Sequence, residues 1–191
     1  HLMAGNASVW ERAEDVLARL ESARRAGSDV TADQYPYTAW QSGLAIVVPS
    51  RRFDDPEAVA DGIAAAGGAD RLQIVGYDAD PPLDGLRLDV IAERWNVTPV
   101  TAYQRILDTG GSGVIGHTMS EEDVATFMRH PLVMTASDGG IGSAHPRGAG
   151  AFARVLAHYS REAGLLSLER AVERGTSQPA ARLGLDDRGR I

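Results

Sequence analysis

The chain has 191 residues, with 43% hydrophobic and 24% charged residues, which is enough for one globular domain with a substantial core. The net charge of −7 argues against a nucleic-acid partner, because phosphate binding needs a basic surface. The absence of cysteine and lysine excludes disulfides, a thiolate nucleophile and Schiff-base chemistry. No apolar run approaches the roughly 20 residues of a membrane span and no signal peptide opens the chain, so we expect a cytoplasmic location.

Apolar spacing and cap signals predict several helices. An apolar face at three- and four-residue spacing predicts the first, over about residues 7–26. Asp55-Pro56 is a strong start signal for a helix to about residue 66, and Thr98-Pro99 and Ser120 give similar signals later. Further helices are expected over about residues 86–95, 99–108, 121–130, 150–163, 168–174 and 179–183.

Four short strands are expected between these helices, over residues 29–33, 72–75, 114–116 and 132–134. Residues 44–48 form a further apolar patch that stops at Pro49. Because helices separate the strands, the pattern predicts an α/β class with a parallel sheet and functional groups at the strand ends. Four strands are too few to close a barrel of eight, so we expect part of a larger structure.

The stretch LVMTASDGGIGSAHPR, from Leu132 to Arg147, is the one most typical of a functional site. A short apolar run is followed by Asp138, three glycines and His145-Pro146-Arg147. Ligands of α/β folds bind at the carboxyl ends of parallel strands, and glycines let backbone approach a ligand closely. Arg147 is a candidate for bidentate binding of a carboxylate. Asp138 alone could equally cap the turn.

Two further titratable residues lie at or just after the ends of predicted strands. Asp33 precedes Gln-Tyr-Pro-Tyr, and a turn-forming role is the favoured interpretation. His117 is interpreted as a packing residue, with metal binding or support of a metal ligand as the alternative. His130 and His158 fall in helices and are interpreted as structural. No HxH, HExxH or cysteine pair occurs, so spacing alone predicts no complete metal site.

Three stretches together resemble the N-acyl-D-amino-acid deacylases (D-aminoacylases) of the amidohydrolase superfamily. They are HLMAGNASVW, then DVTADQYPYTAWQSG, and then VMTASDGG with HPRGAGAFARVLAHY and LLSLERAVERGTSQPAARLGLDDRGRI. These pieces follow the family order over essentially the whole chain. The resemblance implies a parallel-strand, TIM-barrel-type metal-dependent hydrolase. In it, residues 1–191 are a single segment, the C-terminal half of a (β/α)8 barrel that is incomplete at both ends.

The resemblance also implies roles for individual residues. Asp138 matches the catalytic aspartate at the end of the eighth strand, and His1 matches a zinc-ligand histidine at the end of the sixth. A cloning remnant is another origin for His-Leu-Met, but the spacing from His1 to Trp10 favours a native ligand. The substrate carboxylate is expected to bind Tyr35 and Arg147, with Gln41 and Ser42 near a family serine, and His117 and His145 as candidates to support the site.

Departures from the family leave the function open. The family lysine two residues after the ligand histidine is Met3 here, and the family serine falls at Gln41. One hypothesis is zinc-dependent hydrolysis of N-acyl-D-amino acids, which releases a carboxylic acid and a free amino acid. Another is an amidohydrolase for a different amide or a cyclic amide. In both, the partner is a small-molecule substrate, with no nucleic acid and no membrane.

A third hypothesis concerns the isolated chain. The family's HxH pair, its bridging cysteine and a further histidine would precede residue 1, so we expect at most one metal ligand here. The chain alone would then be an inactive fragment. It would associate with the remaining half of the barrel, or with itself through exposed strand edges.

Overall fold

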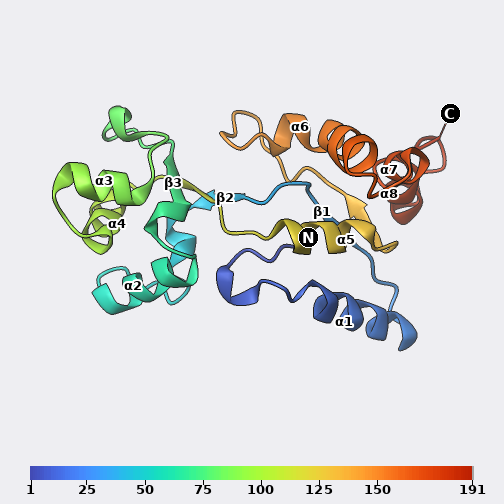
Figure 1. Ribbon diagram of the computed structural model, residues 1–191, viewed down its shortest axis with the longest axis horizontal. Coiled ribbons are helices and arrows are strands. Elements are labelled where there is room, and N and C mark those ends of the chain that lie inside the picture. Colours follow the sequence, from blue (N-terminus) through green and yellow to red (C-terminus); the bar gives the residue numbers. More distant parts are fainter. Residues whose placement is uncertain (191) are drawn as a thin grey trace. The chain divides into compact units, whose positions relative to one another are not determined.

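The structure, a computed structural model, describes residues 1–190 and divides into two compact units (Figure 1). Unit 1 comprises His1–Ala4, Glu11–Tyr37 and the described residues from Ser120 onward, and unit 2 comprises Gly5–Trp10 and Thr38–Met119. Ile191, the last residue of the predicted segment, lies outside the described residues. Within residues 1–190, no helix is both long enough and apolar enough to cross a membrane.

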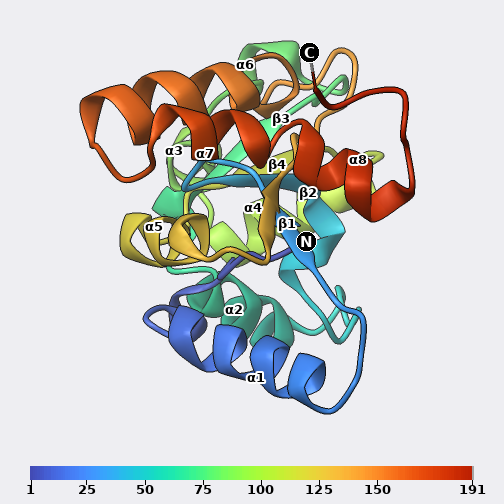
Figure 2. The same cartoon turned by 90° about the vertical axis from the view of Figure 1, so that its right-hand side faces the viewer.

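Unit 1 is built around a pair of parallel strands. Its elements are α1 (Ala13–Arg25), β1 (Ala32–Gln34), α5 (Glu121–Arg129), β5 (Val133–Thr135), α6 (Arg147–Arg154), the π-helix η5 (Val155–Glu162), α7 (Leu168–Glu173) and α8 (Ser177–Leu183). Helices α6 and α7 lie on one side of the strands, and α5 with α1 beside it lies on the other (Figures 1 and 2). A core of Ala13, Leu17, Phe127 and Val133 joins α1 and α5 to β5.

The strand pair confirms the predicted parallel pairing for this unit. β1 and β5 align Ala32 with Val133 and Gln34 with Thr135, so both strands end at the same edge. β1 begins three residues later than expected. Its partner strand follows Pro131, which has no backbone N–H to extend the ladder toward Asp29.

Unit 2 contains an antiparallel sheet, so the prediction of a parallel sheet is wrong there. Its elements are η1 (Ala7–Val9), β2 (Trp40–Gly43), η2 (Leu44–Val47), α2 (Pro56–Ala65), η3 (Ala69–Arg71), β3 (Leu72–Val75), η4 (Pro81–Leu83), α3 (Leu88–Trp95), α4 (Pro99–Asp108) and β4 (Gly113–Gly116). The strand order is β2-β4-β3, antiparallel throughout. Two helices, α3 and α4, connect β3 to β4, and the second returns the chain so that β4 runs back along β3.

Local signals located most helices correctly. The Asp55 side chain accepts hydrogen bonds from the N–H groups of Glu57 and Ala58, and Thr98 and Ser120 cap α4 and α5 in the same way. The first helix begins only at Ala13, because Glu11 adopts a left-handed backbone conformation with φ of 61°. The helix expected from residue 150 begins at Arg147 instead.

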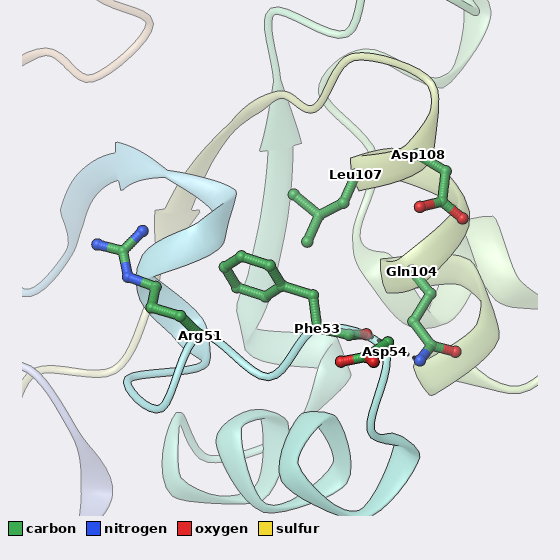
Figure 3. A pocket seen from close by; sticks show the side chains of 6 residues that line it. All are labelled: Arg51, Phe53, Asp54, Gln104, Leu107 and Asp108. Atoms are coloured by element: carbon green, nitrogen blue, oxygen red, sulfur yellow. Dashed lines mark hydrogen bonds between the residues drawn. The ribbon is translucent and has the colours of Figure 1, made fainter.

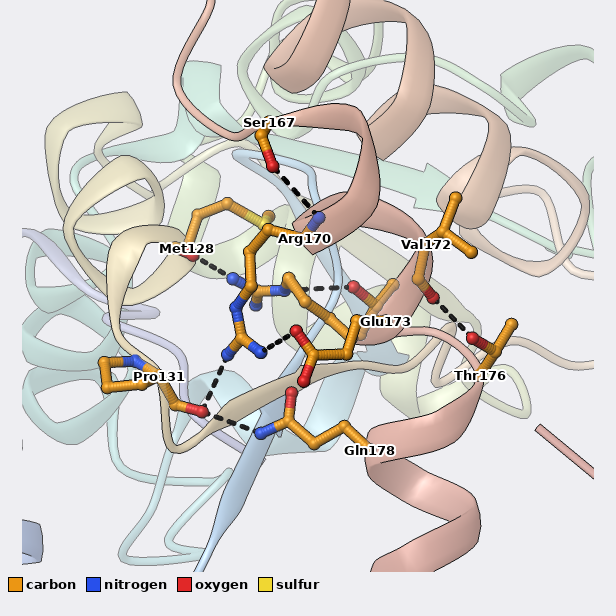
Figure 4. Close-up of polar contacts among 10 residues, drawn as sticks. Met128, Pro131, Ser167, Arg170, Val172, Glu173, Thr176 and Gln178 are labelled. Carbon is orange, nitrogen blue, oxygen red and sulfur yellow. Dashed lines mark hydrogen bonds and ion pairs between the residues drawn. The ribbon is translucent and has the colours of Figure 1, made fainter. Parts of the chain in front are cut away.

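A buried arginine ties α7 to the end of β5. Arg174 has no exposed surface, and its Nε donates to Thr135 Oγ1 at 3.4 Å while its Nη1 donates to Met128 O. The Thr135 N–H donates in turn to the Arg174 carbonyl at 3.0 Å. Nearby, Arg170 donates to the Pro131 carbonyl (Figure 4). Burial lowers the pKa of Arg174 to about 10, helped by the charge of Arg170, so the side chain stays protonated at neutral pH.

Asp123 holds the chain between the N-terminal residues and α1. The residue is buried on α5, and its carboxylate accepts the N–H of Glu11 at 2.9 Å and the N–H of Ala13 at 3.1 Å. These N–H groups precede or open α1, where no intrahelical acceptor exists for them. A carboxylate from another helix therefore supplies the cap that the sequence around residue 12 lacks.

We expect Asp123→Asn to lower the free energy of unfolding by about 2 kcal/mol, because one of two charge-assisted hydrogen bonds is replaced by an opposed pair of donors. Urea unfolding followed by circular dichroism measures the change. Glu122→Gln, on the exposed face of the same helix, is the control with little expected effect. Equal stability of Asp123→Asn and the parent chain would contradict this role.

Candidate functional site

The end of β5 brings a carboxylate and a guanidinium together. Asp138 follows the strand by three residues and has a left-handed backbone with φ of 46°. Its Oδ2 lies 2.9 Å from Nη1 of Arg147, the first residue of α6. The Arg147 side chain is only 10% exposed, whereas that of Asp138 is 50% exposed. The predicted strand-end acid and the predicted carboxylate-binding arginine are therefore direct neighbours.

Glycines make this contact possible. A Cβ on Gly139 would lie 2.2 Å from the Cα of Gly148, so the backbone after Asp138 touches the backbone after Arg147. No larger residue fits at position 139 without moving the loop or α6. The loop and the first turn of α6 line an open cavity of about 420 Å³. Its lining residues are Gly139, Gly140, Ile141, Gly142, Ser143, His145, Pro146, Gly148 and Ala149.

His145 supports the start of α6. The residue is buried, and its Nδ1 accepts the backbone N–H of Arg147 at 3.1 Å. Because Nδ1 is the acceptor, the neutral ring carries its proton on Nε2. The ring packs edge-on against Tyr37 at a centroid distance of 5.2 Å. This packing fixes the backbone from which the Arg147 side chain extends.

Tyr35 lies at the centre of the cluster. It follows β1, is 1% exposed, and its ring lies 5.0 Å from the Arg147 guanidinium and 4.8 Å from the His1 ring. Burial raises the pKa of Tyr35 to about 12, although the Arg147 charge opposes the shift. The hydroxyl is therefore protonated at neutral pH and donates to Sδ of Met3 at 3.0 Å.

Asp33 positions the imidazole of His1. The two side chains meet at 2.6 Å between Asp33 Oδ1 and His1 Nδ1, and the Asp33 carbonyl accepts the Leu2 N–H at 2.8 Å. An ionised carboxylate can only accept, so Nδ1 is the donor and the lone pair of the neutral ring is on Nε2. The turn-forming interpretation missed this contact. The available signal was that Asp33, like Asp138, lies near the carboxyl end of a predicted strand.

The described residues can supply one ligand of a metal site but not a complete ligand set. Zinc sites in proteins use three or four protein ligands. Among residues 1–190, no group of three or more His, Asp and Glu side chains could hold a metal ion. His1 itself has the arrangement typical of a metal-bound histidine, with a carboxylate on one ring nitrogen and a lone pair on the other.

The other predicted site residues belong to unit 2. Gln41 and Ser42 lie on β2, opposite Ile115 and Val114 of β4. The His117 Nε2 lies 2.9 Å from Oε1 of Gln73 on β3. Their predicted roles in substrate binding and in supporting the site stay predictions, because nothing in unit 2 tests them.

Unit 2 has a cavity of its own, about 460 Å³ in volume (Figure 3). It lies between the segment before α2 and the end of α4, and its lining residues are Arg51, Phe53, Asp54, Gln104, Leu107 and Asp108. The Gln104 amide donates to the Phe53 carbonyl at 2.9 Å, which links α4 to the segment before α2. None of the predicted site residues lines it.

Known proteins resemble this chain over nearly its full length. No model of a protein family matches it. It is 38% identical to an N-acyl-D-glutamate deacylase and 34% identical to a D-aminoacylase, both of Alcaligenes xylosoxydans xylosoxydans. These matches cover 95% and 94% of the chain but only 34% and 33% of the relatives. The chain thus spans about a third of the length of these proteins.

Solved structures agree. The N-acyl-D-glutamate deacylase of Bordetella bronchiseptica, crystallised with zinc and a phosphonate mimic of the tetrahedral intermediate, matches with a TM-score of 0.77 and 35% identity. A D-aminoacylase that defines a novel subset of amidohydrolases matches with a TM-score of 0.79 and 32% identity. The two matches cover 94% and 99% of this chain, and 34% and 36% of the solved chains.

The predicted α/β class is confirmed, and the fold corresponds to part of the D-aminoacylase structures. Residues 1–190 form sheets of two and three strands and do not close a barrel. From the sequence and structural matches, the chain is a member of the D-aminoacylase (N-acyl-D-amino-acid deacylase) family and corresponds to about a third of the length of its relatives.

Proposed function

We propose that the protein hydrolyses the amide bond of N-acyl-D-amino acids, with this chain as the C-terminal half of a zinc-dependent (β/α)8 barrel. The observation that supports this most is the contact between Asp138 and Arg147 at the shared strand edge, beside Tyr35. A base and a carboxylate-binding cation in one cluster suit a substrate that carries an amide and a carboxylate. The relatives are named for deacylation of N-acyl-D-glutamate and other D-amino acids.

In this proposal each side chain has one task. The Asp138 carboxylate takes a proton from the attacking water and then gives it to the leaving nitrogen. Arg147 binds the α-carboxylate of the substrate, and the protonated hydroxyl of Tyr35 donates a hydrogen bond to it. These contacts hold the scissile carbon in reach of the water.

His1 serves as one zinc ligand through Nε2, and the remaining ligands come from parts of the barrel outside these residues. Zinc, when bound, polarises the amide carbonyl and lowers the pKa of water to about 7. Asp33 is a positioning residue, because its hydrogen bond to Nδ1 sets the tautomer and the ring orientation of His1.

A second candidate function is hydrolysis of another amide or a cyclic amide. Met3 favours it, because a thioether contacts the Tyr35 hydroxyl where the family has a lysine. A panel of N-acyl-D- and N-acyl-L-amino acids, hydantoins and dihydropyrimidines distinguishes the two. The proposed function predicts turnover of the N-acyl-D-amino acids and a KM that rises in Arg147→Ala. Turnover of the cyclic amides alone would favour the second candidate.

We expect Asp138→Asn, made in the full-length protein, to lower kcat by about 10²- to 10⁴-fold because an amide cannot accept the proton from water. Zinc content, measured by atomic emission, should stay unchanged. Asp61→Asn, on the exposed face of α2, is the matched control. A variant at position 138 that keeps more than a tenth of the activity would rule out this role.

Asp33→Ala should weaken zinc binding by about 10- to 100-fold, since the His1 ring loses the hydrogen bond that orients it. Asp33→Asn, whose carbonyl oxygen still accepts from Nδ1, should lose less. Competition with a fluorescent zinc chelator measures both without recourse to activity. Asp29→Ala is the control, because that exposed carboxylate pairs with Arg24 and Arg182 of unit 1. Unchanged zinc affinity in Asp33→Ala would show that the carboxylate is dispensable.

A further inference from the structure

Asp138, the proposed base, and Arg147, the proposed carboxylate-binding group, form an ion pair with each other in this structure. Oδ2 of Asp138 lies 2.9 Å from Nη1 of Arg147, the distance of a charge-assisted hydrogen bond. A substrate carboxylate that binds this guanidinium must therefore meet the carboxylate already there. The two functions cannot be independent.

Backbone packing prevents the segments that carry Asp138 and Arg147 from moving apart. Gly139 is packed directly on Gly148, and the His145 ring holds the Arg147 N–H. The Arg147 side chain is also confined, because it is nine-tenths buried and lies over the Tyr35 ring. Asp138 has the freedom that Arg147 lacks, since half of its side chain faces solvent. Rotation of the Asp138 side chain is the motion that the site permits.

We propose that the substrate carboxylate displaces Asp138 from the Arg147 guanidinium, and that this exchange releases Asp138 to act as the base. The inference rests on the proposed function and names how the same site selects its substrate. Two carboxylates close together repel each other, which favours replacement over joint binding. The exchange trades one charge-assisted hydrogen bond for another, so its free-energy cost is small.

Through this exchange the substrate carboxylate contributes to catalysis as well as to binding. An amide with a carboxylate both takes its place on Arg147 and turns Asp138 toward the scissile bond. An amide without one leaves Asp138 on the guanidinium. Selection for acyl amino acids over simple acyl amines then follows from one shared cation, without a separate recognition pocket.

The test is a binding measurement with a ligand that cannot be hydrolysed. In 2-methyl-4-oxopentanoate a methylene replaces the amide nitrogen of N-acetylalanine, and 2-pentanone is the same ketone without the carboxylate. Calorimetric titration of the full-length protein compares the parent with Asp138→Asn and Asp138→Ala. Both variants remove the competing charge, and Asp138→Ala also removes the oxygen that could still accept from Arg147.

We expect both variants to bind 2-methyl-4-oxopentanoate more tightly than the parent, by about fivefold, the equivalent of about 1 kcal/mol for a partly exposed ion pair. Their affinity for 2-pentanone should match that of the parent. Arg147→Ala should lose the preference for the acid. A general loosening of the site would instead weaken the binding of both ligands.

Two results would overturn the inference. One is acid binding by both Asp138 variants that is no tighter than in the parent, and the other is equal tightening for the acid and the ketone. Turnover of N-acyl-D-amino acids by the parent protein is measured in a separate assay. Activity without tighter acid binding would leave the proposed function standing and remove the exchange. Tighter acid binding without any turnover would remove the proposed function and the role of Asp138 as the base, and would leave only the competition for Arg147.

Discussion

The backbone contact between Gly139 and Gly148 is the constraint on which the site depends. It brings the loop after β5 against the first turn of α6, and so determines that Asp138 and Arg147 meet. If those two segments lay further apart, no rotamer of Asp138 or Arg147 could bring the two side chains into contact. The buried His145, which accepts the N–H of Arg147, holds the same turn from the other side. A site of long polar side chains is thus held by backbone and a buried ring.

The remainder of unit 1 supports the shared edge of β1 and β5. Arg174 binds Thr135 through both its side chain and its carbonyl, so the end of the strand that leads to Asp138 is held in place. Asp123 fastens the segment that leads from the N-terminal residues into α1. Both are buried charged groups that satisfy main-chain or hydroxyl partners, and both lie outside the cluster whose position they set.

In the proposed mechanism, a single guanidinium links substrate recognition to catalysis. Met3 places an apolar group beside the Tyr35 hydroxyl where the family has a cation, which leaves more of the carboxylate binding to Arg147. The same guanidinium already holds the carboxylate proposed as the base. In the proposed exchange, shared use of one charge would give the site its selectivity with few groups. It also accounts for the pairing of a half-exposed acid with a buried cation.

Local sequence signals determined what depends on neighbours along the chain. Asp55, Thr98 and Ser120 cap the helices that they were expected to cap, and the strand before Asp138 forms within a residue of its predicted place. Only the tertiary structure decided the pairings between distant segments: the antiparallel order of unit 2, the Asp33–His1 contact and the cap from Asp123. Caps and apolar periodicity act over a few residues, whereas strand direction and side-chain partners depend on which remote segments pack together.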